Sequence, residues 1–458
     1  MNILLSHGYF IADDPKEQEI MRPYVPLGLL YISAWLEKHA VEHEVFDTTF
    51  SNFDALKNKI TQHKPDHLGL YVNLMTKLNV LKIIAYIRSQ PELEKINIIL
   101  GGPEVRNHAQ NFLDHGCDFL VLGEGEESFL ELIQKLDSKK TDELILVNGI
   151  CFKDSDGKAF FTPERSKLKD IETLPFPNRK KVDLQLYLNA WKQRHGKNAI
   201  SVSTMRGCPY TCKWCSRAVY GLSYRRRSAK AVVEELSAIQ KEYHPDSLWF
   251  VDDVFTVSHK WMHEFADELN KSGLKINYEC ITRADRLNEE IIALLKQTGC
   301  FRVWIGAESG SQKIIDLMDR RVEVQQVREM IVLTKKFGIE AGTFIMLGYP
   351  GETEADIKET VHHLKTSNPD HFTITIAYPI KGTELYAEVE NAFTSNQDWA
   401  ESTDRQIDFK RTYPKPYYDY AVRYVVNEVN YFKKKAIQFK LKSIAARSAM
   451  WWIRTVHG

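Results

Sequence analysis

The chain carries no net charge: its 458 residues include 61 Lys and Arg against 61 Asp and Glu. A nucleic-acid binder generally has an excess of basic residues, because neutralising phosphates releases counterions and drives binding. The balance therefore argues against a general nucleic-acid binder, and we expect no nucleic-acid partner. With 43% hydrophobic and 27% charged residues the composition is that of a globular protein, and the length suggests about three domains.

Long apolar segments are also missing. No run approaches the roughly 18–20 apolar residues that span a bilayer. The first residues, MNILLSHGYF, lack the charged n-region and long apolar h-region of a signal peptide. We therefore expect a cytoplasmic location, where cysteines serve as thiols or ligands rather than in disulfides.

Cysteine is scarce and unevenly distributed, with seven in the chain. Four lie among apolar neighbours and are expected to be buried small hydrophobic residues: Cys117, Cys151, Cys280 and Cys300. The other three, Cys208, Cys212 and Cys215, fall within CPYTCKWC, closely after a predicted strand. Three thiolates on one loop can hold three irons of a 4Fe–4S cluster and leave the fourth iron open. Zinc is the alternative, but zinc sites generally have a second pair of ligands nearby, and the nearest candidate here is His195 alone.

The first 140 residues alternate apolar strands with amphipathic segments. The predicted strands are 2–6, 43–46, 67–72, 96–100 and 118–122, and the predicted helices are 27–39, 54–62, 77–89, 106–115 and 128–136. Strands that alternate with helices indicate an α/β domain with a Rossmann-like, doubly wound parallel sheet. Ligands of such sheets bind beyond the carboxyl ends of the strands. Two glycine-rich turns, GGP at 101–103 and GEGE at 123–126, lie at such ends.

Residues 141–198 are predicted to be a connector. Asp156-Gly157 between two apolar runs indicates a hairpin, and LPFP at 174–177 indicates an extended crossing. From 199 to 390 a strand-then-helix pattern repeats about six times, which predicts a partial (β/α)6 barrel with its site at the carboxyl ends of the strands. The predicted strands are 199–203, 247–251, 275–279, 301–305, 342–346 and 371–376.

Residues 391–458 are predicted to form a small helical region of different composition. Its tail, 431–458, has seven Lys or Arg, no Asp or Glu, and the adjacent Trp451 and Trp452. The tail is either a plain solubilising helix or a binding segment. A binding segment would contact an acidic substrate or an anionic membrane surface, and in the second case the protein would bind the membrane peripherally. The basic run Arg225-Arg226-Arg227 is likewise either solvated or in contact with an anionic ligand.

The cysteine loop, C-x3-C-x2-C with an aromatic residue before the last cysteine, resembles that of the radical S-adenosylmethionine (SAM) superfamily. In that family the open iron of the cluster binds SAM, and reduction of the cluster cleaves SAM to a 5′-deoxyadenosyl radical that takes a hydrogen from the substrate. The resemblance implies that Cys208, Cys212 and Cys215 are the cluster ligands. It also implies a reductant such as flavodoxin or ferredoxin.

The resemblance also implies a SAM site at the ends of the barrel strands. It assigns the adenine to Trp214 and to the turn residues Gly348, Pro350 and Gly351. It assigns the SAM ammonium group to Asp252 and Asp253, and the ribose to Glu308. Arg283 is assigned to the SAM carboxylate or to the substrate. The alternatives are a helix N-cap for the two aspartates and a plain βα turn for GYPGET at 348–353. No catalytic residue is assigned; aromatic residues near strand ends either line a substrate pocket or belong to the core, namely Tyr278, Trp304, Tyr349 and Tyr378.

The N-terminal segments PLGLLYISAWLEKH, IILGGPEV and DFLVLGEGEESFLELI are similar to those of cobalamin-binding radical SAM proteins, in the group that includes the anaerobic magnesium-protoporphyrin IX monomethyl ester cyclase. The motif D-x-H-x-x-G, which places a histidine on cobalt, is absent. The resemblance therefore implies a base-off corrin, with a weaker candidate contact at 73–77, or a scaffold that has lost its cofactor. The main corrin candidates are Gly101, Gly102, Pro103, Glu104, Gly123, Glu124, Gly125 and Glu126.

Three functions are compatible with these features. The favoured one is methylation of an unactivated carbon, or a phosphorus, of a small-molecule or natural-product substrate by a SAM- and cobalamin-dependent radical enzyme. The second is an oxidative cyclisation, oxygenation or rearrangement without methyl transfer, as the cyclase resemblance suggests. The third is a non-catalytic cobalamin or iron–sulfur sensor, against which the intact cysteine loop argues.

Overall fold

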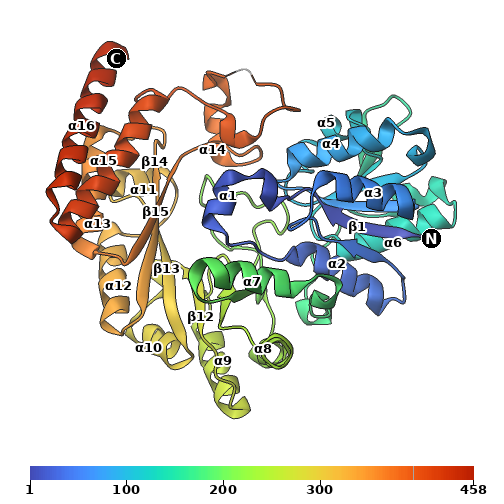
Figure 1. The fold of residues 1–458 in the computed structure, drawn as a ribbon, viewed down its shortest axis with the longest axis horizontal. Helices are drawn as coiled ribbons and strands as arrows, with labels where there is room; N and C mark the ends of the chain where they lie inside the picture. The colour runs from blue at the N-terminus through green and yellow to red at the C-terminus, as the bar shows by residue number, and fades with distance from the viewer. Residues whose placement is uncertain (396, 458) are drawn as a thin grey trace.

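The computed structural model describes residues 1–395 and 397–457 and is built on two sheets that lie side by side (Figure 1). The first sheet has the strand order β2-β1-β3-β4-β5-β6-β7. Its first five strands are parallel: β1 (Ile3–His7), β2 (Glu44–Phe46), β3 (His67–Tyr71), β4 (Asn97–Gly101) and β5 (Phe119–Val121). The predicted Rossmann-like sheet is thus confirmed.

Helices cover both faces of this sheet (Figure 1). One face packs against α2 (Leu27–Lys38) and α6 (Glu126–Asp137), and the other packs against α3 (Phe53–His63), α4 (Lys77–Arg88) and α5 (Ala109–Asp114). The apolar strands are buried on both sides, as parallel strands usually are. The short helix α1 (Pro15–Ile20) lies in the loop before α2.

The predicted hairpin extends this sheet instead of standing apart in the connector. Its strands β6 (Ile150–Lys153) and β7 (Ala159–Phe161) add to β5 in antiparallel pairing. Without them β5 would be an open edge strand, and covering such edges protects a sheet from pairing with other chains. The connector that follows contains α7 (Leu184–His195).

The second sheet has six parallel strands in the order β15-β14-β13-β12-β11-β8. They are β8 (Ala199–Val202), β11 (Ser247–Phe250), β12 (Tyr278–Thr282), β13 (Cys300–Glu308), β14 (Glu340–Leu347) and β15 (His371–Ile376). The helices between them are α8 (Ala229–Tyr243), α9 (His259–Ser272), α10 (Glu289–Gln297), α11 (Gln312–Leu317), α12 (Val324–Lys336) and α13 (Glu354–Ser367). The sheet stays open between β8 and β15, which confirms the predicted partial barrel.

Individual elements follow from local sequence. Ser228 caps α8 by accepting a hydrogen bond from the Ala231 N–H at 3.2 Å, and Val232 and Leu236 on one face of that helix are buried. β12 begins three residues later than predicted, because its ladder starts where Tyr278 pairs with Leu248 of β11.

The C-terminal region contains α14 (Glu384–Val389) and a hairpin of two long helices, α15 (Lys415–Lys434) and α16 (Ile437–His457). The hairpin packs beside α13 at the edge of the second sheet (Figure 1). Residues 396 and 458 of the predicted helical region lie outside the described residues. Among the residues that are described, no helix is long and apolar enough to cross a bilayer.

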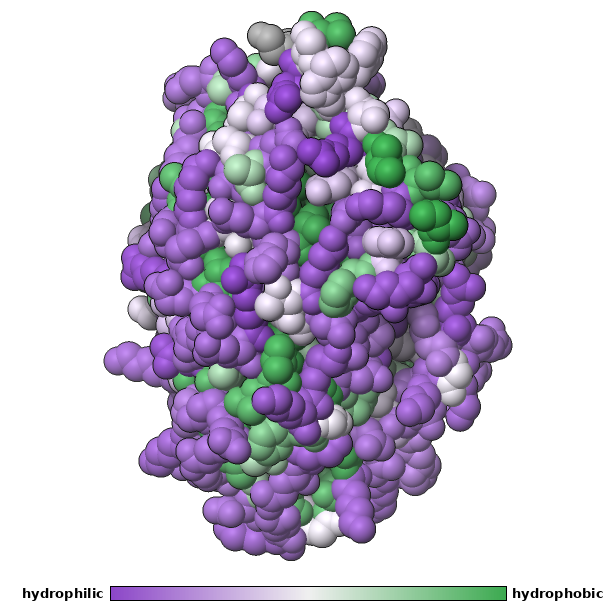
Figure 2. Space-filling model, turned by 90° about the vertical axis from the view of Figure 1, so that its left-hand side faces the viewer, coloured by the Kyte–Doolittle hydropathy of each residue, from purple (hydrophilic) through white to green (hydrophobic). Residues whose placement is uncertain are grey.

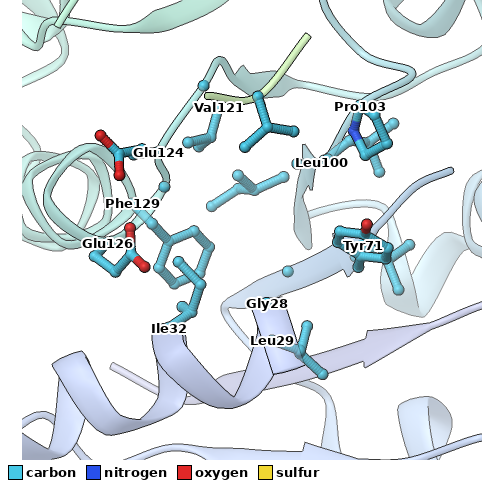
Figure 3. A pocket seen from close by; sticks show the side chains of 18 of the residues that line it. Gly28, Leu29, Ile32, Tyr71, Leu100, Pro103, Val121, Glu124, Glu126 and Phe129 are labelled. Carbon is cyan, nitrogen blue, oxygen red and sulfur yellow. The ribbon is translucent and has the colours of Figure 1, made fainter. Parts of the chain in front are cut away.

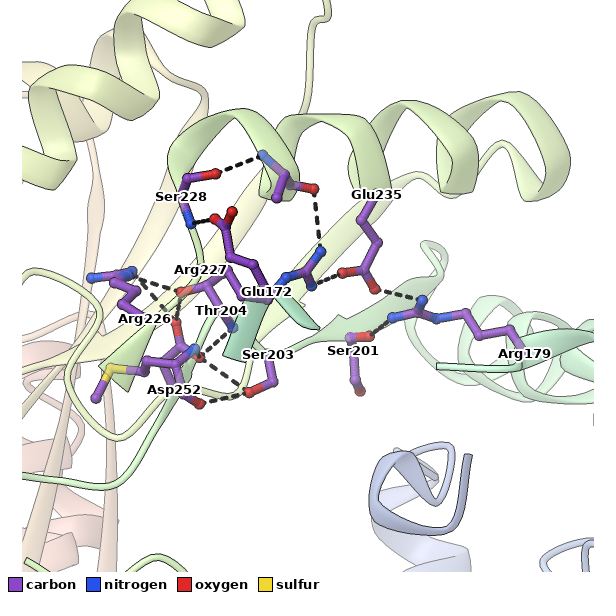
Figure 4. Close-up of polar contacts among 12 residues, drawn as sticks. Glu172, Arg179, Ser201, Ser203, Thr204, Arg226, Arg227, Ser228, Glu235 and Asp252 are labelled. Carbon is purple, nitrogen blue, oxygen red and sulfur yellow. Dashed lines mark hydrogen bonds and ion pairs between the residues drawn. The ribbon is translucent and has the colours of Figure 1, made fainter. Parts of the chain in front are cut away.

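Buried ion pairs fasten the connector to the second sheet (Figure 4). Glu235 of α8 accepts a hydrogen bond from Arg179 of the connector at 2.6 Å and also pairs with Arg227. All three side chains are buried. Arg226 stacks on Trp261 at 3.5 Å and lies 3.5 Å from Asp252, while Arg225 pairs with Glu124. The prediction that this arginine run is solvated is therefore wrong, because each guanidinium is matched by a carboxylate of the chain.

Candidate active site

The cysteine loop lies between two short strands, β9 (Met205–Arg206) and β10 (Arg225–Arg226), which pair with each other. Cys208, Cys212 and Cys215 are free thiols. All three line one cavity of about 150 Å³ at the carboxyl ends of the second sheet. The structure therefore brings the predicted cluster ligands together at the predicted edge.

No single-ion site forms here. Within residues 1–395 and 397–457, no group of three His, Cys, Asp or Glu side chains is gathered closely enough to hold one metal ion. His195 contacts the backbone, with Nε2 3.0 Å from the carbonyl oxygen of Ile20. The zinc alternative thus lacks its extra ligand, whereas three thiols around one cavity suit a cluster of several irons.

Two arginines contact the sulfur of Cys212. Arg283 Nη1 lies 3.8 Å from Cys212 Sγ, and Arg320 Nη1 lies 3.7 Å from it. Arg283 is held by Asp285 at 2.8 Å and by the ring of Tyr210 at 3.8 Å. The two guanidinium groups therefore place positive charge at the wall of the cysteine cavity. That charge suits an iron–sulfur cluster, which is held by thiolates.

Glu308 projects into the same cavity from an irregular strand end. The pairing of β13 with β14 shifts register between Gly306 and Glu308, and Glu308 has a left-handed backbone with φ of 65°. Such conformations are costly for a residue with a side chain and cluster at functional sites. Burial raises the pKa of Glu308, while the charges of Arg320 and Arg283 oppose the shift.

The two adjacent aspartates have different roles. Asp252 is buried and accepts hydrogen bonds from the backbone N–H groups of Thr204 at 2.7 Å and Met205 at 3.2 Å, so it fastens the base of the cysteine loop (Figure 4). Asp253 lines the cysteine cavity together with Trp214. Among the described residues Asp253 has no hydrogen-bond partner in its own chain. Of the pair, Asp253 is therefore the carboxylate available to a ligand.

A second cavity, of about 230 Å³, lies at the carboxyl ends of β3, β4 and β5 (Figure 3). Its wall is mostly apolar, with Leu100, Val121 and Phe129 around it. The backbone of Gly102 lines it with φ of 116°, and a Cβ atom there would lie 2.3 Å from the carbonyl oxygen of Val72. Only glycine can therefore hold this wall in place. A mostly apolar recess with glycine in its wall fits a corrin ring.

A third cavity, of about 310 Å³, joins the other two. It shares four wall residues with the apolar recess, namely Gly28, Pro103, Val219 and Tyr220, and four with the cysteine cavity, namely Cys208, Cys215, Arg217 and Asp253. One continuous space thus runs from the first sheet to the cysteine loop. No histidine lines any of the three cavities, which agrees with the missing D-x-H-x-x-G motif.

The predicted corrin contacts divide into two groups. The residues that line the recess are Gly101, Gly102, Pro103, Gly123, Glu124, Gly125 and Glu126. The carboxylates of Glu124 and Glu126 are paired with Arg206 of β9, Glu124 at 2.8 Å, so they join this glycine-rich turn to the base of the cysteine loop. Glu104 does not line the recess; it is buried near His108 and Asp404 of the C-terminal region, and burial raises its pKa to about 7.

Several other predicted residues lie away from the cavities. In the turn at 348–353, the Gly348 N–H donates to Glu352 at 2.6 Å and the Gly351 carbonyl accepts from Lys313 at 2.8 Å. This turn, with Pro350, lines none of the three cavities. Tyr278 is fully buried and hydrogen-bonds Thr298 at 2.7 Å.

The remaining aromatic candidates also lie outside the cavities. Tyr349 is buried, Trp304 donates to Glu279 at 3.0 Å, and Tyr378 is half-buried after β15. The core alternative holds for Tyr278, Tyr349 and Trp304 because their rings are enclosed by protein. Trp304 also stacks on Phe344, and Phe344 lines the cysteine cavity.

Among the cavity-lining residues that sequence reasoning missed are three with large polar side chains: Arg206, Tyr220 and Arg320. Arg206 stands two positions before Cys208, which is a signal that could have been used. Arg320 lies 105 residues beyond Cys215, and no motif marks it. Tyr220 follows the cysteine loop in AVYGLSY, where it reads as an ordinary aromatic residue.

Two protein-family models match the chain: the radical SAM superfamily over residues 202–364 and the B12 binding domain over residues 19–133. An uncharacterized methyltransferase of Pyrococcus horikoshii is 30% identical over 393 residues, covering 82% of this chain and 81% of that protein. The chain belongs to the cobalamin-binding radical SAM superfamily. Membership confirms the predicted enzyme class and the predicted cofactors: a 4Fe–4S cluster, SAM and cobalamin.

Other members of the superfamily share the same architecture. The anaerobic magnesium-protoporphyrin IX monomethyl ester cyclase of Rubrivivax gelatinosus is 25% identical, covering 81% of this chain and 67% of that protein. The structure of the radical SAM methyltransferase TsrM from Kitasatospora setae, with cobalamin and a [4Fe-4S] cluster bound, superposes with a TM-score of 0.74. That comparison covers 94% of this chain and 88% of TsrM at 16% identity, and it shows the shared fold.

Proposed function

We propose that this enzyme methylates an unactivated carbon of a small-molecule substrate, using SAM and cobalamin. The observation that carries the proposal is the continuous space from the apolar recess to the cysteine loop. A substrate in the middle cavity would lie within reach of ligands held at both ends, and such positioning can supply much of a rate enhancement. When bound, the cofactors supply one-electron cleavage of SAM and carriage of the methyl group.

The chain's own residues would have the following roles. Cys208, Cys212 and Cys215 would hold the cluster, and Arg283 and Arg320 would place positive charge beside it. Asp253 would bind the SAM ammonium group, Glu308 its ribose and Trp214 its adenine, since all three line the cysteine cavity. The first domain, residues 1–140 extended by the hairpin strands β6 and β7, would bind the corrin. The barrel domain, residues 199–390, would bind the cluster and SAM. The rest of 141–198 connects the two domains, and 391–458 form the helical region.

The test of methyl transfer uses SAM labelled in its methyl group. Turnover should give 5′-deoxyadenosine and S-adenosylhomocysteine in comparable amounts, with label in a product that has gained one CH2 unit. Deoxyadenosine without S-adenosylhomocysteine beyond the amount of bound corrin would contradict the proposal. Such a result, with a product that has lost hydrogen or gained oxygen, would favour the cyclase-like alternative, which the relative from Rubrivivax gelatinosus supports.

We predict that cobalamin binds in the apolar recess, base-off and without histidine on cobalt. A Gly102→Ala variant should hold cobalamin about tenfold more weakly, a loss of roughly 1.4 kcal/mol, because its Cβ would lie 2.3 Å from the Val72 carbonyl oxygen and displace the wall of the recess. Absorbance spectra of the reconstituted protein after desalting measure both effects. Gly157→Ala is the matched control, since Gly157 also has positive φ but has open space around it. A histidine-on spectrum, or equal retention by the two variants, would count against the assignment.

We also infer a one-electron reductant, such as flavodoxin or ferredoxin, and a cytoplasmic location. Support for both comes from the chemistry of the family: the cluster must be reduced before SAM is cleaved, and thiolate ligands persist best in a reducing compartment. Peripheral contact with a membrane is argued from separate observations below.

A further inference from the structure

Helix α16 has two apolar faces on opposite sides. One face is buried against the rest of the molecule and contains Ala446, Met450 and Ile453. The other is open, with six large apolar side chains that are each more than half exposed: Ile437, Leu441, Ile444, Trp451, Trp452 and Val456. At 3.6 residues per turn, five of these side chains fall within one strip directly opposite the buried face. Val456 lies at the margin of this strip.

Figure 2 faces this end of the molecule and shows apolar side chains gathered along its upper right, with hydrophilic side chains around them. Soluble proteins rarely leave such a strip of large apolar residues open without a binding role. A helix that needed only to be soluble would place polar residues there. The strip is therefore an interaction surface.

The charges beside the strip have one sign. Residues 431–458 contain seven Lys or Arg and no Asp or Glu. Lys440 and Arg454 are paired with Glu428 at 3.0 Å and Glu354 at 2.7 Å. Among the described residues, the other five cations of this segment are exposed and form no ion pair. Lys433 donates to the Pro369 carbonyl oxygen, and the remaining four are Lys434, Lys435, Lys442 and Arg447. These cations are available to an anionic partner.

We propose that the open face of α16 docks on an anionic lipid bilayer, with the helix lying in the plane of the interface. Tryptophan side chains favour the boundary between headgroups and acyl chains, and Trp451 and Trp452 both lie on the strip. Unpaired lysines and arginines beside an apolar strip are typical of helices that bind anionic membrane surfaces. A second copy of the chain fits less well, since a two-fold contact would place the same cations against one another. The helix is too polar to span the bilayer.

The full-length protein can be sedimented with vesicles of phosphatidylcholine alone or mixed with phosphatidylserine. We expect binding to the mixed vesicles, little binding to the neutral ones, and a steep loss of binding as salt rises. The substitution W451S/W452S should weaken binding at least about tenfold, because it removes interfacial anchors. The substitution K434Q/K435Q/K442Q/R447Q should weaken it by at least about tenfold at low salt and abolish the preference for phosphatidylserine.

The variant I145S/L146S is the matched control. Ile145 and Leu146, at 55% and 68%, are about as exposed as Trp451 and Trp452, but they lie far along the chain from α16. It should bind vesicles like the unaltered protein. Thermal unfolding followed by circular dichroism verifies that each variant is folded, and exposed positions such as Trp451 should tolerate substitution. Absence of binding to the mixed vesicles, or equal binding by W451S/W452S, would overturn the proposal. A dimer in solution that W451S/W452S dissolves would also overturn it and assign the face to a second copy. Neither result bears on methyl transfer.

Discussion

Replacing Cys208, Cys212 and Cys215 together with alanine should remove the iron from the protein. A methyl group cannot take the place of a thiolate ligand, and within the described residues no group of three or more His, Cys, Asp or Glu side chains is gathered as an alternative metal site. After anaerobic reconstitution the unaltered protein should contain about four irons per chain and give a reduced-state paramagnetic signal that SAM shifts. The triple variant should contain close to none and should cleave no SAM.

The control for this experiment is Cys300→Ala, which removes one of the four cysteines that the sequence assigns to the core. Cys300 is buried and its sulfur contacts the carbonyl oxygen of Arg302 rather than the cavity. The variant should keep its iron and lose only about 1 kcal/mol of stability. A triple variant that retained a full cluster would show that the ligands lie elsewhere, whereas loss of iron from Cys300→Ala as well would point to general unfolding.

Local sequence patterns were sufficient to predict both sheets. Each parallel strand of the two large sheets is a short apolar run, and a helix follows most of them, so the alternation of strands and helices follows from periodicity and from the need for helical crossovers. The partner of an edge strand is not encoded locally. For that reason the hairpin β6–β7 was placed correctly in the chain but not on the edge of β5.

Charge pairing over long distances escaped prediction for a related reason. Arg225, Arg226 and Arg227 look like a solvated run, since three adjacent cations are usually exposed. Their partners, Glu124, Asp252 and Glu235, come from three different elements, and only the fold brings them together. The same holds for Asp252 and Asp253, which are chemically identical. The sequence does not indicate that Asp252 accepts backbone hydrogen bonds from Thr204 and Met205.

The site was predictable where a motif fixes it and unpredictable where the cavity is shared between domains. The cysteine spacing and the two glycine-rich turns identify residues that do line the connected space. The wall between the two ends depends on Gly28, Val219 and Tyr220, which come from α2 and from the end of the cysteine loop. No spacing rule links these segments, because their contact arises from how the two sheets pack.

The substitution Glu235→Gln should cause the largest loss of stability, about 3–5 kcal/mol. Removing one member of a buried ion pair leaves an uncompensated buried charge, and here two guanidinium groups, those of Arg179 and Arg227, would lose their shared carboxylate. Urea unfolding at neutral pH measures the difference. Glu234→Gln, which alters the exposed neighbour on the same helix, should change stability by no more than about 0.5 kcal/mol. Equal effects of the two substitutions would contradict the role of Glu235.

The same pair of variants gives a pH test. Burial by itself would raise the pKa of Glu235, but the charges of Arg179 and Arg227 outweigh burial and hold the pKa below its ordinary value of 4.5. Because the folded-state pKa is lowered, the carboxylate stabilises the protein fully above that ordinary value and loses its contribution as the pH falls through the folded pKa. The stability gap between the unaltered protein and Glu235→Gln should therefore be constant near neutrality and shrink only below about pH 4.5. A gap that closed between pH 7 and pH 5 would mean that a different group, such as a histidine, is responsible.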